Sequence, residues 1–137
     1  MKKKVLFICT HNSARSQMAE GLLNHFYGNE YEGLSAGTQP GRVHPMAITV
    51  MNEIGIDISS HYSKNVREFL GQPIHTVLTV CDSARETCPF FPGAQLYLHE
   101  SFKDPSAAQG TDEEKLAVFR SVRNEIQTWI RSTFGNL

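Results

Sequence analysis

The first part of the chain changes from a continuous apolar run to a helical periodicity. Residues 4–9 form an apolar run led by lysine, which is typical of a strand buried on both faces. From Ser16 to Gly28 the apolar residues recur every three or four positions, which predicts an amphipathic helix ended by glycine. We therefore expect the chain to open with a strand, a tight polar turn and a helix.

Three later segments have the composition of strands. Residues 31–36, followed by Gly37, predict a short second strand, and residues 74–81 are rich in β-branched side chains, which favours another buried strand. Residues 96–98 predict a weaker fourth strand. The segment 82–93 fits neither helix nor strand, and long loops in compact domains are often functional.

Three later helices are predicted from end signals and apolar spacing. Pro45 suits the first turn of a helix that Gly55 closes, and Ser63 is a candidate cap for a shorter helix that stops before Gly71. The last helix begins with a capping box over Thr111–Glu114. Its apolar stripe consists of Leu116, Phe119, Val122, Ile126, Trp129 and Ile130.

The alternation of strands and helices predicts an α/β fold. We expect a three-layer α/β/α doubly wound sheet of four parallel strands, formed by residues 1–137 as a single domain. Such folds bind their ligands beyond the carboxyl ends of the strands. Cys9 and Cys81 end predicted strands and Asp104 follows the last one, so we expect all three at one edge of the sheet.

Composition excludes several functional classes. Hydrophobic residues make up 40% of the 137 residues and charged residues 20%, with 13 lysines and arginines against 14 acidic residues. This balance disfavours disorder and a nucleic-acid-binding surface. The apolar run after the first lysines is too short for an export signal, and no run approaches the ~18 residues of a membrane helix. We expect a cytoplasmic protein that binds neither nucleic acid nor membranes.

An odd number of cysteines argues against a structural disulfide framework. In a reducing compartment Cys9, Cys81 and Cys88 are either small core residues or reactive thiols. Cys81 and Cys88 are spaced too widely for a typical zinc half-site, and the six histidines are far apart in sequence, so we expect no metal site. The histidines, including His99, are interpreted as surface or packing residues.

The loop after the first strand has the features of an anion site. Unpaired backbone N–H groups and the helix dipole favour an anion there. The candidate oxyanion-binding residues are Thr10, His11, Asn12, Ser13, Ala14 and Arg15. Arg15 adds a two-pronged donor, the positive field favours the thiolate of Cys9, and Ser13 or Ser16 can hydrogen-bond that sulfur. The loop predicts nucleophilic attack by Cys9 on a phosphate-like oxyanion, against the alternative that Cys9 is only a core residue.

Phosphoryl transfer also needs a proton donor for the leaving group. Asp104, followed by Pro105, is the candidate general acid because it follows the fourth predicted strand. An Asp-Pro pair is also a common turn and helix-start signal, so this alternative stays open.

Taken together, these segments resemble the low molecular weight tyrosine phosphatase superfamily, and within it the thioredoxin-coupled arsenate reductases. The segments that carry the resemblance are Val5–Gly21, Ser35–Gly37, Gly55–Ser59, Cys81–Pro89, Asp104–Pro105 and Gln109–Glu114. The resemblance runs nearly end to end.

The resemblance implies reduction of arsenate to arsenite by a relay of three thiols. Cys9 would attack arsenate held by the loop and Arg15, with Ser16 steadying the thiolate and Asp104 assisting the leaving group. Cys81 would form a Cys9–Cys81 disulfide and release arsenite, and Cys88 would then form Cys81–Cys88 by exchange. No bound cofactor is implied. The electrons would come from thioredoxin, with glutathione and glutaredoxin as the alternative, and the protein is expected to be a monomer.

Two other functions remain open from the sequence. A protein-tyrosine phosphatase would need only Cys9, Arg15 and Asp104, whereas an oxyanion-binding or redox-sensing domain would need no acid. The aromatic residue expected after Asp-Pro in such phosphatases is replaced by Ser106.

The loop region also departs from the family pattern at two positions. His11 stands where the family often has glycine. Lys64 replaces an aspartate of a potassium site that some members form with positions matching Asn12, Glu20 and Ser35, so no potassium dependence is expected.

Overall fold

The computed structural model describes residues 2–82, 84 and 88–135 and has the predicted α/β fold. Its sheet contains β1 (Lys3–Cys9), β2 (Tyr31–Gly37), β3 (Thr76–Thr79) and β4 (Leu96–His99) in the order β2-β1-β3-β4. All three neighbouring pairs are parallel, as predicted. The carboxyl ends of β1 and β3 therefore lie together at one edge of the sheet.

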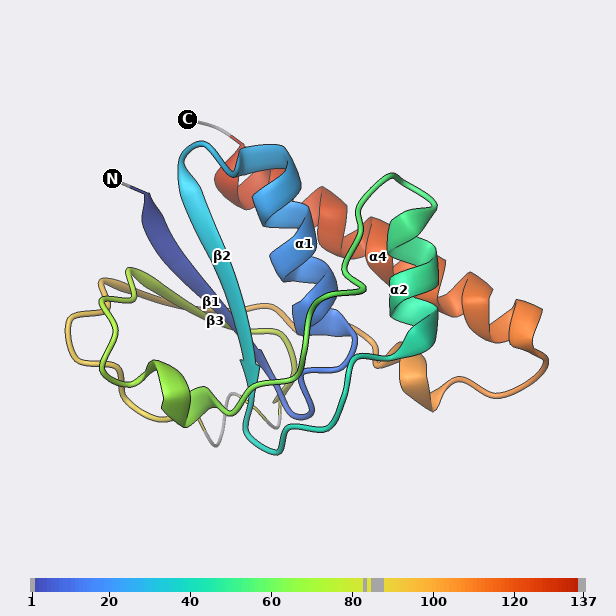
Figure 1. The fold of residues 1–137 in the computed structure, drawn as a ribbon, viewed down its shortest axis with the longest axis horizontal. Coiled ribbons are helices and arrows are strands. Elements are labelled where there is room, and N and C mark those ends of the chain that lie inside the picture. Colours follow the sequence, from blue (N-terminus) through green and yellow to red (C-terminus); the bar gives the residue numbers. More distant parts are fainter. Residues whose placement is uncertain (1, 83, 85–87, 136–137) are drawn as a thin grey trace.

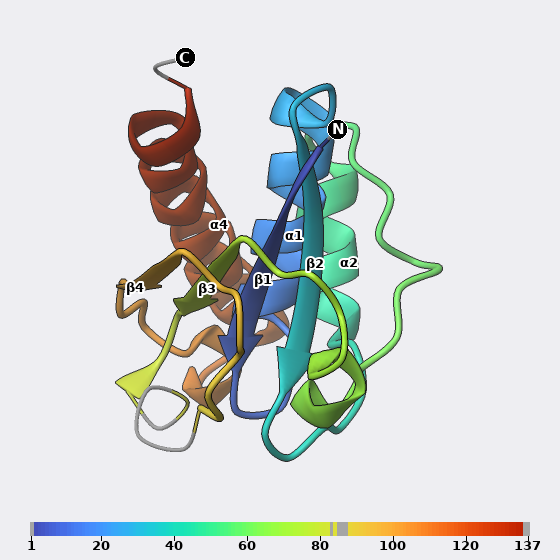
Figure 2. The same cartoon turned by 90° about the vertical axis from the view of Figure 1, so that its left-hand side faces the viewer.

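The α-helices gather on one side of this sheet (Figure 1). They are α1 (Arg15–Tyr27), α2 (Pro45–Asn52) and α4 (Asp112–Phe134). α1 packs on β1 and β2, and α4 packs on α1 and α2. The 3₁₀ helix η1 (Val66–Phe69) lies on the opposite face, which Figure 2 turns towards the viewer. Over the described residues, η1 and connecting segments form the layer on that face.

Burial distinguishes the central strand from the edge strand. Residues 5–8 of β1 are completely buried, which confirms the prediction of a strand covered on both faces. Leu96, Tyr97 and Leu98 of the edge strand β4 are 48%, 47% and 37% exposed. The fourth strand has a weak sequence signal because it has only four residues and its side chains are half exposed to solvent.

Several predicted boundaries need correction. α2 ends at Asn52 rather than at Gly55, which lies in the following turn with a φ of +80°. The short helix is capped by Asn65, whose side chain accepts a hydrogen bond from Arg67 N, and not by Ser63. The strand predicted over 74–81 is shorter, because β3 covers only residues 76–79. Part of the unassigned segment 82–93, namely residues 83 and 85–87, lies outside the described residues.

The last helix follows its predicted pattern. The side chain of Thr111 accepts a hydrogen bond from Glu114 N, and the Glu114 carboxylate accepts one from Thr111 N. The predicted apolar stripe supplies Phe119, Val122 and Ile126 to the core. Within the described ranges no helix is long and apolar enough to cross a membrane. α4 instead covers α1 and brings the segment before it, which carries Asp104, next to the loop after β1.

Candidate active site

The loop between β1 and α1 curls around the sulfur of Cys9. Asn12 has a φ of +51°, and its backbone N–H donates a hydrogen bond to Cys9 Sγ at 3.2 Å. Close packing against β2 requires glycine at position 37, since a Cβ there would lie 2.7 Å from Thr10 O. The left-handed residue and the glycine together allow the loop to turn back on the end of β1.

Ser16 provides the second contact to the sulfur. Its Oγ lies 2.8 Å from Cys9 Sγ and 2.8 Å from Asn12 Nδ2. Because the amide nitrogen of Asn12 donates to the Ser16 oxygen, the Ser16 hydroxyl hydrogen is free to point at sulfur. Cys9 is 2% exposed, and Ser16 and Asn12 are completely buried. The two donors around Cys9 Sγ are arranged to stabilise negative charge on it.

Asn12 is itself held by its neighbours. Its backbone oxygen accepts hydrogen bonds from Ser63 Oγ at 2.7 Å and Gln17 Nε2 at 3.1 Å. Its Oδ1 accepts one from Lys64 N at 3.0 Å. A left-handed backbone costs a non-glycine residue about 1–2 kcal/mol, and these hydrogen bonds offset that cost.

Arg15 faces Asp104 across the entrance of the loop. Arg15 Nη1 donates to Phe102 O at 3.2 Å, and Nη2 lies 3.6 Å from Asp104 Oδ2. The Arg15 side chain is 12% exposed and that of Asp104 is 40% exposed. Arg15 thus begins α1, and Phe102 O and Asp104 hold its guanidinium.

Asp104 starts a turn, as one sequence interpretation predicts, and it also pairs with Arg15. Its Oδ1 accepts hydrogen bonds from Ser106 N at 3.0 Å and Ser106 Oγ at 2.7 Å, which starts the 3₁₀ helix η2 (Pro105–Ala107). Burial raises the pKa of the Asp104 carboxyl, but the hydrogen bonds from Ser106 and the charges of Arg15 and His11 outweigh it. The pKa of Asp104 is therefore lowered from its ordinary value.

The second cysteine lies against the loop. Thr10 Oγ1 is 3.4 Å from Cys81 Sγ, and Cys81 is 5% exposed. β3 delivers Cys81 to this position because it pairs with β1 in parallel register, so that the two strands end side by side. Thr10 therefore links the first two cysteines of the predicted relay.

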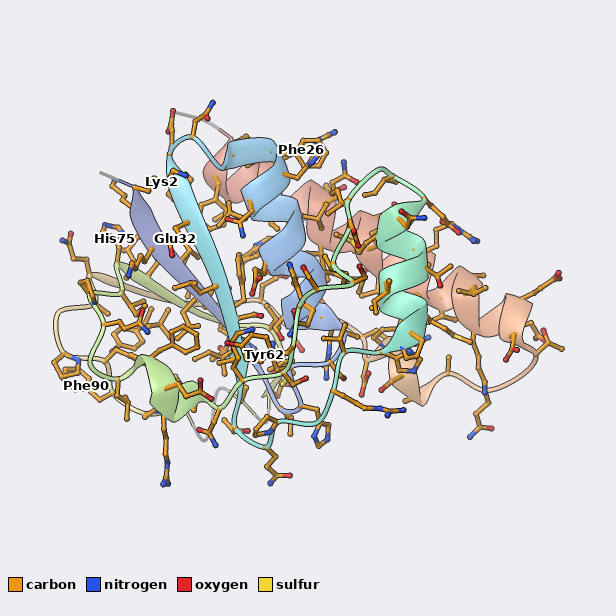
Figure 3. The ribbon with its side chains drawn as sticks, viewed as in Figure 1. Lys2, Phe26, Glu32, Tyr62, His75 and Phe90 are labelled. Atoms are coloured by element: carbon orange, nitrogen blue, oxygen red, sulfur yellow. The ribbon has the colours of Figure 1, made fainter. Side chains whose placement is uncertain are left out.

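Cys88 lies in a separate groove of about 570 Å³. The groove is lined by Val77 and Thr79 of β3, by Tyr97, Leu98 and His99, and by Pro89 and Phe90. On β1, Phe7 contacts Phe134 of α4, so its neighbours Leu6 and Ile8 point to the other face of the sheet. Val77 and Thr79 are in register with Leu6 and Ile8 and point the same way. The groove therefore opens on the face opposite α4. Figure 3 shows Phe90 on that side of the molecule.

The three cysteines are free thiols in this structure. The thiol of Cys88 is half-buried and donates to Pro89 O at 3.4 Å. Burial raises the pKa of the Cys88 thiol. The structure thus brings Cys9, Cys81, Arg15, Ser16 and Asp104 together at one edge, and places Cys88 in the groove.

The side chains at the two positions that depart from the family pattern both form hydrogen bonds. His11 Nδ1 lies 2.9 Å from Gln39 O, and since a carbonyl oxygen only accepts, Nδ1 carries the hydrogen. Lys64 Nζ donates to Tyr62 O at 2.8 Å and lies 4.0 Å from Glu20 Oε1. An ammonium group therefore occupies the neighbourhood where the resemblance would place a free cation.

Buried polar residues behind the loop escaped the sequence prediction. Gln17 is completely buried, and its Oε1 lies 3.0 Å from His61 Nδ1 while its Nε2 donates to Asn12 O. A glutamine among the buried residues of α1 is the sequence feature that could have indicated this polar contact. Among the described residues, no group of three or more His, Cys, Asp or Glu side chains is placed to hold a metal ion.

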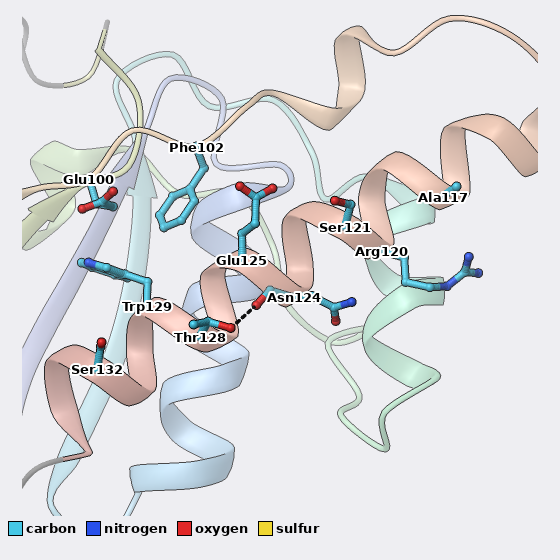
Figure 4. A pocket seen from close by; sticks show the side chains of 10 residues that line it. All are labelled: Glu100, Phe102, Ala117, Arg120, Ser121, Asn124, Glu125, Thr128, Trp129 and Ser132. Carbon is cyan, nitrogen blue, oxygen red and sulfur yellow. Dashed lines mark hydrogen bonds between the residues drawn. The ribbon is translucent and has the colours of Figure 1, made fainter.

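A larger groove of about 800 Å³ lies along α4 and contains none of the predicted site residues (Figure 4). Glu100, Phe102 and Trp129 contribute to its lining, and the Phe102 and Trp129 rings meet edge to face at 5.6 Å. It touches the candidate active site through Phe102, whose carbonyl oxygen accepts from Arg15. The predicted nucleophile Cys9 and the groups that contact its sulfur lie instead in the loop after β1.

Comparisons with known proteins agree with this geometry. Residues 4–137 match the family described as low molecular weight phosphotyrosine protein phosphatase. The arsenate reductase of Halalkalibacterium halodurans is 46% identical over 131 residues, which cover 96% of this chain and 94% of that protein.

Solved structures agree as well. An arsenate reductase in the phosphate binding state has a TM-score of 0.81 and 33% identity, with 95% of each chain covered. A thioredoxin-dependent arsenate reductase from Corynebacterium glutamicum has a TM-score of 0.70 and 30% identity, over 96% of this chain and 61% of that one.

Proposed function

The chain belongs to the low molecular weight phosphotyrosine protein phosphatase family, and on that premise we propose that it reduces arsenate to arsenite by a three-cysteine relay. The observation that carries the proposal is the contact between Thr10 Oγ1 and Cys81 Sγ at 3.4 Å. A phosphatase needs one thiol, whereas here a second thiol lies against the loop that holds the nucleophile.

In the first step, Cys9 attacks arsenate bound by the loop amides and Arg15. The thiolate forms a sulfur–arsenic bond, and a hydroxyl of arsenate leaves as water with a proton from Asp104. The lowered pKa of Asp104 depends partly on the charge of Arg15. A bound oxyanion shares the Arg15 charge and adds negative charge of its own, and both effects raise the pKa of the acid when it is needed.

In the second step, Cys81 attacks the sulfur of Cys9. A Cys9–Cys81 disulfide forms, the sulfur–arsenic bond breaks, and its electron pair reduces arsenic from the pentavalent to the trivalent state as arsenite leaves. Cys88 then attacks Cys81 and expels Cys9 as a thiolate, which Ser16 and the Asn12 N–H stabilise.

The final Cys81–Cys88 disulfide requires an external dithiol. We propose thioredoxin, because a relative in Corynebacterium glutamicum is described as thioredoxin-dependent. The surface beside Cys88 suits a protein reductant: Phe90 is 74% exposed and stacks on Tyr97, with ring centroids 6.3 Å apart. Glutathione with glutaredoxin is the competing donor. A cytoplasmic monomer is the setting we propose for this exchange.

Hydrolysis of phosphate esters is the second candidate function. It is favoured by the convergence of Cys9, Arg15 and Asp104, which a cysteine-dependent phosphatase also uses. It is disfavoured for phosphotyrosine because the residue after Pro105 is Ser106, so no aromatic ring stands there to flank a substrate ring.

The two functions separate in one experiment. Arsenate-dependent NADPH oxidation is measured with thioredoxin and its reductase, or with glutathione and glutaredoxin, beside hydrolysis of an aryl phosphate. Cys81→Ser should abolish arsenate turnover and retain aryl phosphate hydrolysis. Cys9→Ser should abolish both. Unchanged arsenate turnover in Cys81→Ser would contradict the relay, and Thr128→Ala on the outer face of α4 serves as the control variant.

A further inference from the structure

His99 connects the surroundings of the two later cysteines. Its Nδ1 lies 2.7 Å from Thr79 Oγ1, and its Nε2 lies 3.0 Å from Asp82 Oδ1. Asp82 directly follows Cys81 in the chain, while Thr79 and His99 line the groove that holds Cys88. A titratable side chain that shares the groove of Cys88 therefore also contacts the residue next to Cys81.

The partners of His99 fix its protons. A carboxylate only accepts, so Nε2 carries a hydrogen and donates it to Asp82. In the neutral imidazole, Nδ1 is then an acceptor and receives the hydroxyl hydrogen of Thr79. The His99 side chain is 20% exposed and that of Asp82 is 77% exposed. This arrangement of carboxylate, imidazole and hydroxyl is the kind that takes up a proton at Nδ1 and stabilises the resulting imidazolium.

Cys88 needs such an acceptor. Only the thiolate attacks a disulfide, and burial raises the pKa of the Cys88 thiol, so the attacking form is scarce at neutral pH. The other titratable groups described around the groove are less suited. The Tyr97 hydroxyl accepts a hydrogen bond from Phe91 N at 2.7 Å and donates one to Phe91 O at 3.0 Å. The Asp82 carboxylate is already bonded to His99.

We propose that His99 accepts the proton of Cys88, through the Thr79 hydroxyl, when Cys88 attacks the Cys9–Cys81 disulfide. The inference rests on the proposed relay and assigns a role within it. The Cys88–Cys81 bond forms, the Cys81–Cys9 bond breaks, and its electron pair leaves on Cys9 as a thiolate. The proton moves to Nδ1 of His99, where Asp82 balances the charge, so the exchange needs no other reagent.

The experiment is a single turnover at stoichiometric arsenate, without external reductant. Samples are quenched with an alkylating agent, released arsenite is counted, and the two disulfides are quantified by mass spectrometry. His99→Gln should release arsenite at the wild-type rate but convert Cys9–Cys81 into Cys81–Cys88 at least about tenfold more slowly at pH 7. The deficit should shrink as pH rises, because the Cys88 thiol then ionises without help.

Two further variants separate proton transfer from a structural role. Asp82→Asn removes a charge from an exposed side chain and should also slow the exchange at neutral pH. His75→Gln is the matched control. His75 Nδ1 also bonds a threonine of β3, Thr76 Oγ1 at 2.8 Å, but His75 does not line the groove. The His75→Gln protein should convert Cys9–Cys81 into Cys81–Cys88 at the wild-type rate.

The outcomes distinguish this inference from the proposed function. Equal exchange rates in His99→Gln and wild type, or slowing by one factor at every pH, would overturn the role of His99. A wild-type protein that releases no arsenite would instead overturn the relay itself.

Discussion

Ser16 Oγ lies 2.8 Å from Cys9 Sγ, and its own hydrogen is free for the sulfur because Asn12 Nδ2 donates to the same oxygen. Ser16→Ala removes this donor, so the Cys9 thiolate loses a hydrogen bond that stabilises it. We expect kcat for both arsenate reduction and aryl phosphate hydrolysis to fall about tenfold to a hundredfold. The rate of Cys9 alkylation at neutral pH, followed in Cys81→Ser/Cys88→Ser protein, checks the cause.

From the residues alone both Ser13 and Ser16 are candidates for this contact, and the resemblance assigns it to Ser16, so Ser13→Ala is the matched control. It should alkylate at Cys9 at the wild-type rate. A Ser16→Ala protein that matched it in both assays would show that the hydroxyl does not act on the sulfur.

Asn12 combines a φ of +51° with a side chain that bonds Ser16 and Lys64 N. Asn12→Gly keeps the backbone conformation accessible and removes the side-chain bonds, whereas Asn12→Ala also introduces strain. Both variants should lose at least about tenfold in kcat. Asn12→Ala should be less stable to urea than Asn12→Gly by about 1 kcal/mol.

One result would contradict this role for the Asn12 side chain. Full activity in Asn12→Gly would mean that the loop needs only its left-handed backbone, and that the side-chain bonds to Ser16 and Lys64 are dispensable.

Ser106 should set the pH range in which Asp104 acts as an acid. Its hydrogen bonds favour the charged carboxylate and lower the pKa of Asp104. In Ser106→Ala the hydroxyl donor is lost, so the pKa of Asp104 rises and more of the acid is protonated at a given pH. The descending limb of kcat/KM for aryl phosphate hydrolysis should move to higher pH, by up to about one pH unit. A limb that stays in place or moves down would exclude Asp104 as the proton donor.

Glu53 joins α2 to α4 through two arginines. Its carboxylate accepts hydrogen bonds from Arg120 Nε at 2.8 Å and Nη2 at 2.7 Å, and from Arg123 Nη1 at 3.0 Å. The hydrogen bond from Arg120 is the largest cause that lowers the Glu53 pKa from 4.5 to about 2. The charged form is thus favoured in the folded protein, and its stabilisation is present above pH 4.5 and lost as the pH falls towards 2.

Glu53→Gln should therefore lower the free energy of unfolding near pH 7, and the difference should disappear at the acidic end. The carboxylate is 35% exposed, so solvent screens the pair and we expect about 1 kcal/mol or less. Urea unfolding of both proteins at a series of pH values measures this. A difference that persists unchanged below pH 3 would contradict the ionic origin.

Much of the sheet edge was predictable because local patterns determine it. The apolar run up to Cys9, the glycine that ends the second strand and the capping box at Thr111 each predict one boundary that the structure confirms. Parallel strands then bring the ends of β1 and β3 together, which is why Cys81 lies near the loop.

The remaining features depend on contacts between distant segments. Asn65 displaces Ser63 as the cap of η1, and Ser63 instead donates to Asn12 O, a partner 51 positions away in sequence. The sequence predicts only a surface or packing residue at His99, whereas the pairing of β4 with β3 places it beside Thr79, a contact that the local pattern does not encode. Spacing along the chain carries no information about such pairs.

The most direct test of the account is the disulfide that forms in Cys88→Ser protein after one equivalent of arsenate. The relay predicts one arsenite released per protein and a Cys9–Cys81 disulfide, identified by mass spectrometry after thiol alkylation. Wild-type protein treated in the same way should instead accumulate Cys81–Cys88. Release of arsenite with Cys81 still alkylatable, or no arsenite at all from either protein, would contradict the proposed function.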